Sequence, residues 1–211
     1  MRGYSKIEII KKAWSHVAKN LRFFALSTIM IAFVGWFPDF VVSKVAEDNI
    51  ILRLTVIIVT VAISSLISIG FLRVVLNAVD RKHLKFSDIF NNYRLILKYL
   101  TAEAISGIFV SAGLLFFIVP GIILSVRLQF TEYFIVDEGI GPIDALKKSW
   151  KITKGATWEL FLFILLLILI NVAGALALGV GLLLSYPTSL IAQAYVFRKL
   201  KKNASELVIE T

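Results

Sequence analysis

Residues Leu160–Leu184 read LFLFILLLILINVAGALALGVGLLL, a run of apolar side chains in which Asn171 is the one strongly polar residue. A helix needs about 20 apolar residues to cross the hydrocarbon core of a bilayer. This run is longer than that, and it continues toward Arg198 with few polar side chains. The pattern therefore predicts a tight pair of transmembrane helices in this part of the chain.

The composition of the whole chain indicates a membrane protein. Of its 211 residues, 58% are hydrophobic and 18% are charged, whereas a soluble domain is about half apolar and about a quarter charged. The longest polar stretch, residues 77–98, is too short to form a soluble domain. We therefore expect one integral membrane domain over residues 1–211, with no soluble catalytic domain and with the first apolar segment retained as a span.

Six apolar segments are separated by polar or turn-forming residues. Irregular backbone cannot face lipid, so each segment is expected to be helical. Pro120 with Gly121, and Gly179 with Gly181, are turn formers placed where one span must reverse into the next. The prediction is an all-α polytopic membrane helix bundle of three hairpins, with spans at about 23–42, 50–75, 100–119, 121–136, 160–178 and 180–197.

The lysines and arginines indicate how these spans are oriented. Most lie in residues 1–22, 73–98, 147–154 and 198–202, whereas the alternate connections hold little more than Lys44. Cytoplasmic segments carry the Lys and Arg excess, so we expect a multi-pass protein of the cell membrane with both termini cytoplasmic. The net charge of +9 is then a consequence of topology. Nucleic-acid binding is the weaker interpretation, because the basic residues are not gathered on one polar domain.

Each predicted hairpin is preceded by a segment with helical spacing of apolar residues and one large aromatic residue, Trp14, Tyr93 or Trp150. The apolar stripes are Ile7, Ile10, Trp14 and Val17; Phe86, Ile89, Phe90, Tyr93 and Leu97; and Ile143, Leu146 and Trp150. Such segments are typical of basic amphipathic helices at a membrane surface. They are either a true internal repeat or independent examples of that type. The expected contacts to lipid headgroups are Lys11, Lys12, Trp14, Lys85, Tyr93, Lys98, Lys147, Lys148, Trp150 and Lys154.

Several short motifs resemble a known membrane domain. They are Pro120-Gly121-Ile122-Ile123, Ile135-Val136-Asp137-Glu138, Asp144-Ala145-Leu146-Lys147-Lys148-Ser149-Trp150, Thr153-Lys154-Gly155 and Tyr186-Pro187. With them, residues 84–200 resemble the membrane domain of bacterial glycerophosphodiester phosphodiesterases and a related family of free-standing six-span proteins. The resemblance implies a six-span fold and an accessory role. It does not imply the hydrolase activity, because the chain has no segment that could hold that domain.

Three polar residues within predicted spans form a candidate intramembrane site: Arg127, Glu132 and Asn171. Ionisable groups in spans are costly and are often functional. The alternatives are that Arg127 extends to the headgroups, that Glu132 lies near the inner interface, and that Asn171 hydrogen-bonds a neighbouring helix. Pro187 should kink the last span, which is a feature of some transporter sites.

The side chains argue against catalysis. The chain has no cysteine, and its two histidines, His16 and His83, are far apart. No metal ligand set and no nucleophile with a base is evident, so we expect no enzyme activity, metal or cofactor. The expected function is a non-enzymatic accessory or scaffold role at the anionic cytoplasmic leaflet, with anionic phospholipids and a protein partner or second copy as partners. The alternative is a small transporter or lipid-moving protein with a site around Arg127, Asn171 and Pro187.

Overall fold

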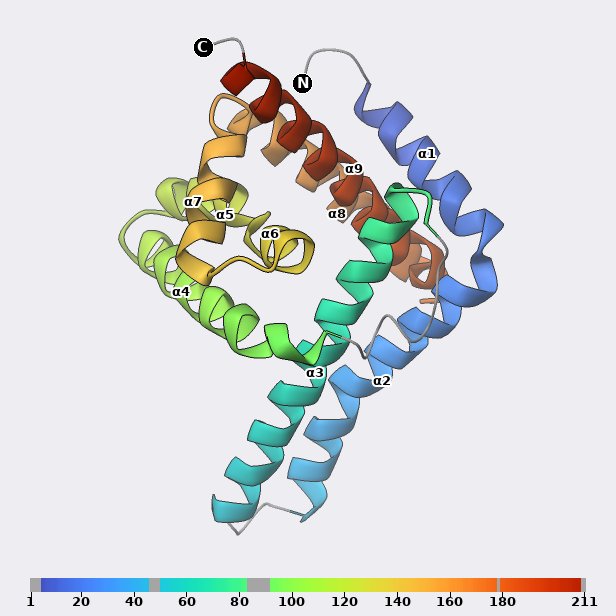
Figure 1. The fold of residues 1–211 in the computed structure, drawn as a ribbon. Helices are drawn as coiled ribbons and strands as arrows, with labels where there is room; N and C mark the ends of the chain where they lie inside the picture. Colours follow the sequence, from blue (N-terminus) through green and yellow to red (C-terminus); the bar gives the residue numbers. More distant parts are fainter. Residues whose placement is uncertain (1–4, 46–49, 83–91, 178, 210–211) are drawn as a thin grey trace.

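The computed structural model describes residues 5–45, 50–82, 92–177 and 179–209, and within these ranges every regular element is a helix (Figure 1). This confirms the predicted all-α class. The elements are α1 (Lys6–Lys19), α2 (Leu21–Val45), α3 (Ile50–Val79), η2 (Tyr93–Leu95), α4 (Ile96–Phe116), α5 (Ile118–Leu128), α6 (Thr131–Glu138), α7 (Pro142–Thr153), α8 (Thr157–Leu176) and α9 (Leu182–Ile209).

Four helical segments of the described ranges are long and apolar enough to cross a membrane. They are Ile50–Val79, Tyr93–Phe116, Ile118–Glu138 and Thr157–Leu176. Helix α1 and the first part of α2 meet at 95°, and counting this bent pair as one span raises the total to five. The apolar side chains of α3 face outward along most of its first half, as lipid-facing helices require.

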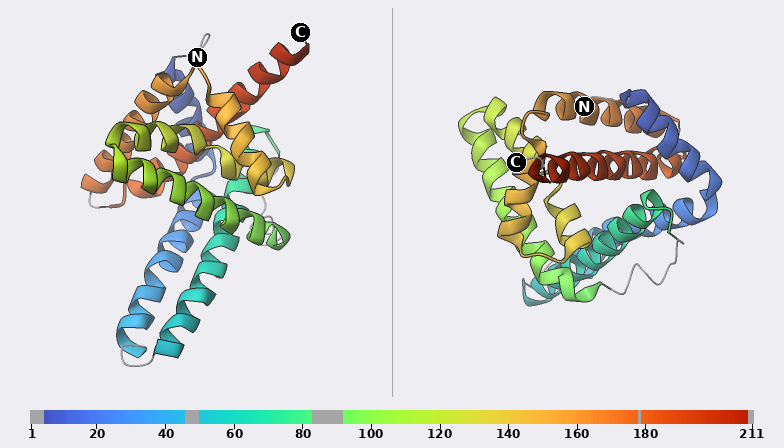
Figure 2. Two further views of the ribbon diagram at one scale, coloured as in Figure 1. Left: turned by 90° about the vertical axis from the view of Figure 1, so that its left-hand side faces the viewer. Right: turned by 45° about the horizontal axis from the view of Figure 1, so that its top comes forward.

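Helix α9 is the centre of the fold, because α1, α2, α3 and α8 all pack against it. Figure 2 shows it between the N-terminal helices and the α4–α7 segment. Ile191, Ala192 and Phe197 of α9 are fully buried. The predicted span 180–197 lies in this helix, but it is not among the segments apolar enough to be counted as spans. A helix surrounded by other helices needs less hydrophobicity than one that faces lipid, since its neighbours cover its polar groups.

The three hairpins α2–α3, α4–α5 and α8–α9 do not run parallel to one another. Figure 2 shows the α4–α5 hairpin lying across the direction of the long α2–α3 hairpin. The start of α1 and the end of α9 both lie away from the tips of α2 and α3 (Figure 1). The fold is therefore not an array of three parallel hairpins packed side by side.

One predicted boundary in the middle of the chain is wrong. The reversal expected at residues 119–121 is at Phe117, which is extended with φ −155° and ψ 130°, and Pro120 lies in the first turn of α5. Proline is tolerated there because first-turn amides have no intrahelical partner. The predicted span 121–136 lies within the apolar segment Ile118–Glu138, which consists of two helices, since α5 ends at Leu128 and α6 begins at Thr131.

Glycine pairs hold the α4–α5 and α8–α9 hairpins in close contact. A Cβ atom on Gly121 would lie 2.6 Å from the backbone nitrogen of Leu114, and one on Gly113 would lie 2.9 Å from the Cα of Gly121. In the other hairpin, a Cβ on Gly181 would lie 2.7 Å from the Cα of Gly174. Both hairpins therefore depend on the absence of side chains where their backbones meet.

Candidate functional site

Helices α1 and α7 bury residues at the same positions relative to their tryptophans, Trp14 and Trp150. In α1 the buried residues are Ile9, Ala13 and Val17, which are five before, one before and three after Trp14. In α7 the residues at the corresponding positions, Ala145, Ser149 and Thr153, are also buried. The two helices thus pack on the rest of the protein in one register.

The predicted apolar stripes coincide with the buried faces only in part, since Val17 of α1 and Leu146 of α7 are buried. Ile7 and Trp14 of α1 are exposed, with relative accessibilities of 59% and 47%, and Ile143 and Trp150 of α7 are exposed at 50% and 40%. The spacing of apolar residues identifies an apolar stripe on each helix, but it does not show which face of the helix packs on the protein. Each helix therefore has a face packed on the protein and an exposed edge with one tryptophan, a residue enriched at membrane interfaces.

The lysines predicted to contact headgroups divide into two groups. Lys11, Lys12, Lys147 and Lys154 are exposed, whereas Lys148 donates a hydrogen bond of 2.5 Å to Glu138 Oε2. Lys98 donates to the carbonyl oxygen of Gly139 at 2.6 Å. The last two lysines therefore tie elements together as well as carrying charge.

The second predicted surface helix lies mostly outside the described residues. Lys85, Phe86, Ile89 and Phe90 fall in residues 83–91. The described part begins with η2 and passes directly into α4, so no separate surface helix follows Tyr93, whose side chain is exposed.

Arg127 lies at the end of α5, where α7 and α8 meet it. Its Cζ atom is 4.0 Å from the centroid of the Trp150 ring, and its Nε donates a hydrogen bond to Thr157 Oγ1 at 3.4 Å. Its carbonyl oxygen accepts hydrogen bonds from Ser149 and Thr153 at 2.7 and 3.3 Å. The guanidinium is thus part of the contact that seats α7 on the bundle.

Glu132 and Asn171 have other partners. The Oε2 atom of Glu132 accepts a hydrogen bond of 2.9 Å from the hydroxyl of Tyr99. The Nδ2 atom of Asn171 donates to Ser189 Oγ on α9 at 2.8 Å and to its own helix at Leu167. The contacts of the described residues therefore do not join Arg127, Glu132 and Asn171 into one site.

A network of charged side chains joins α3, α6, α7 and α9, and sequence analysis did not single it out. Arg198 donates to both carboxylate oxygens of Asp80, at 2.9 and 2.7 Å, and to Asp137 at 2.6 Å. Lys201 pairs with Asp137 at 2.5 Å and with Glu138 at 2.8 Å. Burial lowers the pKa of Lys201, but its hydrogen bonds to these two carboxylates outweigh burial and raise the pKa above its ordinary value.

Phe197 and its aromatic neighbours lie beside this network. The ring centroid of Phe197 is 5.0 Å from that of Phe134 and 5.3 Å from that of Tyr133. The Nζ of Lys201 is 5.9 Å from the centroids of both phenylalanines. In the sequence, the signal for this aromatic and charged cluster was Phe197 followed directly by Arg198 at the end of the last apolar run.

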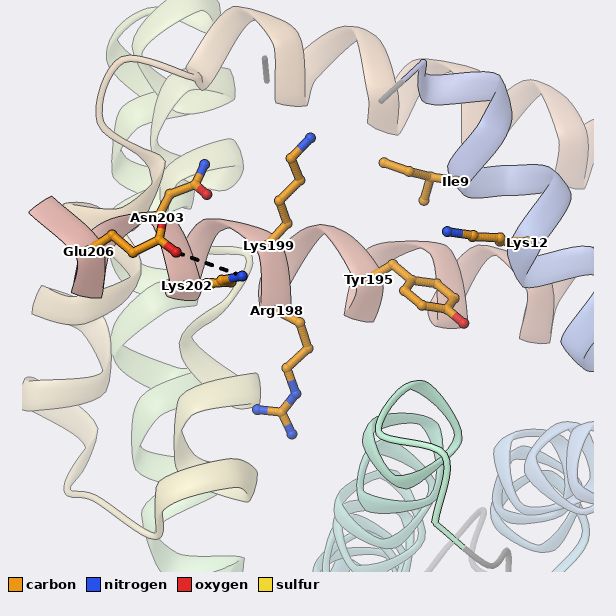
Figure 3. A pocket seen from close by; sticks show the side chains of 8 residues that line it. All are labelled: Ile9, Lys12, Tyr195, Arg198, Lys199, Lys202, Asn203 and Glu206. Atoms are coloured by element: carbon orange, nitrogen blue, oxygen red, sulfur yellow. Dashed lines mark ion pairs between the residues drawn. The ribbon is translucent and has the colours of Figure 1, made fainter. Parts of the chain in front are cut away.

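Cavities lie between the helices of the described residues, and three of them differ in their linings. The first, of about 390 Å³, lies between α1 and α9 and is lined by lysines and an arginine (Figure 3). The second, of about 310 Å³, lies among α4, α5 and α7 beside Lys147 and Trp150. The third, of about 640 Å³, lies between α2 and α9 and has Thr28 and Tyr186 in an otherwise apolar wall.

A family model described as a domain of unknown function (DUF7847) matches residues 25–208. The chain belongs to the DUF7847 family. No curated protein and no solved structure matches it. The DUF7847 match contains α7, Arg127 and the charge network, whereas α1 precedes it.

The described part of this DUF7847 chain has no group of three or more His, Asp or Glu residues placed to hold a metal ion. Two of its least exposed acidic residues, Asp137 and Glu138, are instead paired with cations. The arrangement can bind and position charged surfaces. The candidate site is therefore the set of basic helices α1, α7 and the end of α9, with the cavities between them.

Proposed function

We propose that this DUF7847 protein is a non-enzymatic integral membrane protein with an accessory or scaffold role at the anionic cytoplasmic leaflet. The observation that carries the proposal is the common register of α1 and α7. Each helix is fixed to the bundle by one face and presents exposed lysines and a tryptophan at its edge. Lysines near an anionic surface contribute up to about 1 kcal/mol each to membrane association. The predicted resemblance to the phosphodiesterase membrane domain agrees with such a role.

The proposed threading has six crossings with both termini cytoplasmic. Its support is the Lys and Arg distribution and the position of the start of α1 and the end of α9, which lie away from the tips of α2 and α3 (Figure 1). Because the chain has no cysteine, single cysteines can report on sidedness. An impermeant maleimide added to intact cells should label Ile50→Cys, and should label Ser205→Cys only after permeabilisation. Labelling of both in intact cells would contradict the threading.

Flotation with vesicles tests the role at the leaflet. The variant Lys147→Gln/Lys151→Gln/Lys154→Gln removes three exposed charges from α7 without touching Lys148, which pairs with Glu138. Purified protein carrying these changes should associate at least about tenfold less with vesicles that contain phosphatidylglycerol, and the difference should disappear at high salt.

The matched control keeps the charge at the same positions. The variant Lys147→Arg/Lys151→Arg/Lys154→Arg should associate as the unchanged protein does, because the attraction is one of charge. Equal association of the glutamine and arginine variants would refute a role at the anionic leaflet. Vesicles of phosphatidylcholine alone should not distinguish the variants.

A small transporter or lipid-moving protein is the second candidate, and one observation favours it. In the contact between α8 and α9, Asn171 Oδ1 and Ser185 Oγ are buried and have no hydrogen-bond partner among the described residues. Unsatisfied polar atoms within a membrane helix pair are costly, so they indicate a ligand or water at this contact. Labelling of Ser185→Cys with a maleimide decides the matter: a position that water reaches supports transport, and an unreactive one refutes it.

A further inference from the structure

The cavity among α4, α5 and α7, hereafter the α7 cavity, combines apolar walls with a single cation. Its volume of about 310 Å³ lies at the lower end of the range of roughly 300–1,000 Å³ that small-molecule sites occupy. A cavity of this size and polarity suits part of one alkyl chain better than a polar ligand. The lining is Phe109 of α4, Leu124 and Leu128 of α5, and Leu146, Lys147 and Trp150 of α7.

The α7 cavity opens toward lipid. Leu146 in its wall is buried, whereas Phe109 and Trp150 are exposed, with relative accessibilities of 55% and 40%. Helices α4 and α5 belong to the segments Tyr93–Phe116 and Ile118–Glu138, which are long and apolar enough to cross a membrane. Water that entered an opening between such apolar side chains would find few polar partners. We therefore expect hydrocarbon to fill the cavity.

Lys147 has no counter-ion among the described residues. Its side chain is exposed, and it forms no ion pair or hydrogen bond within the part of the chain that the structure describes. Asp144, three residues earlier on α7, is also exposed and is not paired with it. The carboxylate of Glu138 is already paired with Lys148 and Lys201. The charge of Lys147 is therefore available to an anion outside the protein.

A second cation lies beside the same wall. Trp150 lines the α7 cavity, and the Cζ atom of Arg127 is 4.0 Å from the centroid of its ring. The Nε of Arg127 donates to Thr157, and the side chain forms no ion pair with another described residue. A guanidinium has five donors, so others remain for an anion. The apolar cavity is thus bordered by two positive charges and has no acidic lining residue.

We propose that the α7 cavity holds part of one acyl chain of an anionic phospholipid, whose phosphate Lys147 binds. A lysine binds phosphate as a point charge, and its long stem reaches from an apolar wall to the level of the headgroups. The inference rests on the proposed function and deepens it, because it names the lipid that α7 binds. A soluble anion would not use the apolar walls, and an uncharged lipid would not use Lys147.

Native mass spectrometry of the full chain in detergent, with phosphatidylglycerol added, tests the proposal. The unchanged protein should retain one lipid molecule. Lys147→Gln should reduce the retained fraction about fivefold, the loss expected for one lysine beside an anionic headgroup. Lys151→Gln is the matched control, because Lys151 is also exposed on α7 but does not line the cavity. It should retain the lipid as the unchanged protein does.

A second variant tests the cavity without changing the charge. Leu128→Trp fills the α7 cavity, so it should lower retention of phosphatidylglycerol at least as much as Lys147→Gln does. Its association with vesicles should equal that of the unchanged protein, because every lysine of α7 is kept. A failure of the cavity and a failure of the leaflet role therefore give different results. Thermal unfolding confirms that each variant is folded.

Three results would contradict the proposal. Equal retention by Lys147→Gln and Lys151→Gln would show that Lys147 does not bind the phosphate. Full retention by a folded Leu128→Trp variant would place the lipid outside the α7 cavity. Displacement of phosphatidylglycerol by an equal concentration of oleate would overturn the assignment to a phospholipid, since a fatty acid also combines an alkyl chain with an anion.

Discussion

The guanidinium of Arg127 lies over the indole of Trp150, with its Cζ atom 4.0 Å from the ring centroid. This contact joins the end of α5 to α7, the better described of the two basic surface helices. It gives the arginine a partner in a region where an isolated cation would be costly. The position of α7 on the bundle thus depends on a residue that sequence analysis treated as a candidate for transport.

The first prediction concerns this pair. Arg127→Met and Trp150→Leu should each destabilise the protein, and their effects should be coupled by about 0.5–2 kcal/mol, the value of a cation–π contact from exposed to desolvated settings. The measurement is a double-mutant cycle on the free energy of unfolding in detergent. Strictly additive effects would show that the stacking contributes nothing.

The second prediction concerns the glycine contacts of the hairpins. Gly121→Ala and Gly181→Ala should each lower stability by about 1–3 kcal/mol, because the new Cβ would meet backbone atoms that cannot move independently. Gly107→Ala is the matched control, since nothing lies within 4 Å of its added Cβ in α4. It should be neutral or stabilising by up to about 1 kcal/mol. Thermal unfolding of the three variants checks this.

The third prediction concerns the charge network. Asp137→Asn should cost about 1–3 kcal/mol, because the carboxylate holds Arg198 and Lys201 at 2.6 and 2.5 Å and little of its side chain is exposed. Glu206→Gln removes an exposed partner of Lys202 and should change stability by less than about 0.5 kcal/mol. Chemical unfolding measures both. Similar losses for the two variants would contradict a special role for Asp137.

The fourth prediction concerns pH. Burial, followed by Lys19 and Arg81, lowers the pKa of His16 in α1. The unfolded histidine has a pKa of about 6.5, so below that pH the unfolded chain binds the proton more readily than the folded one. The contribution of His16 to the stability of the fold is therefore complete above about pH 6.5. It is lost as pH falls toward the lower pKa that His16 has in the folded protein.

Hydrogen exchange of the α1 amides checks this expectation. Exchange in α1, corrected for its intrinsic pH dependence, should be less protected at acidic pH than at neutral pH. His16→Gln should remove the difference, because glutamine does not titrate. An unchanged pH response in that variant would assign the effect to another group.

The sequence predicts the helical class and the long apolar helices, because both follow from the length of each apolar run. It does not predict that α9 is central: Thr188 and Ser189 are buried there at little cost because their hydroxyls donate to backbone carbonyls and other helices cover them. It also does not show which residues of α1 pack on protein. Apolar spacing alone cannot distinguish Ile9, which packs on protein, from Ile7, which is exposed.

The candidate site was predicted in part. The exposed lysines of α1 and α7 follow from charge patterning, and their exposure agrees with it. The pairing of Arg198 with Asp80 and Asp137 joins residues that are far apart in the chain. A single sequence carries no signal for such a pairing, since it is determined by how α3, α6 and α9 meet.

The packing of α1 on α9 joins the first and the last described helices, and it has a consequence for biosynthesis. Helix α1, with its buried residues Ile9, Ala13 and Val17, packs chiefly against a helix that is synthesised after α1–α8. Until α9 emerges, α1 lacks its main protein partner, so it must wait at the membrane surface while the intervening helices are inserted. Domains whose closing contacts are this distant in sequence fold late and expose apolar surface in the interval. A ribosome-stalled or truncated chain that lacks α9 should therefore be a preferred substrate for membrane quality-control proteases.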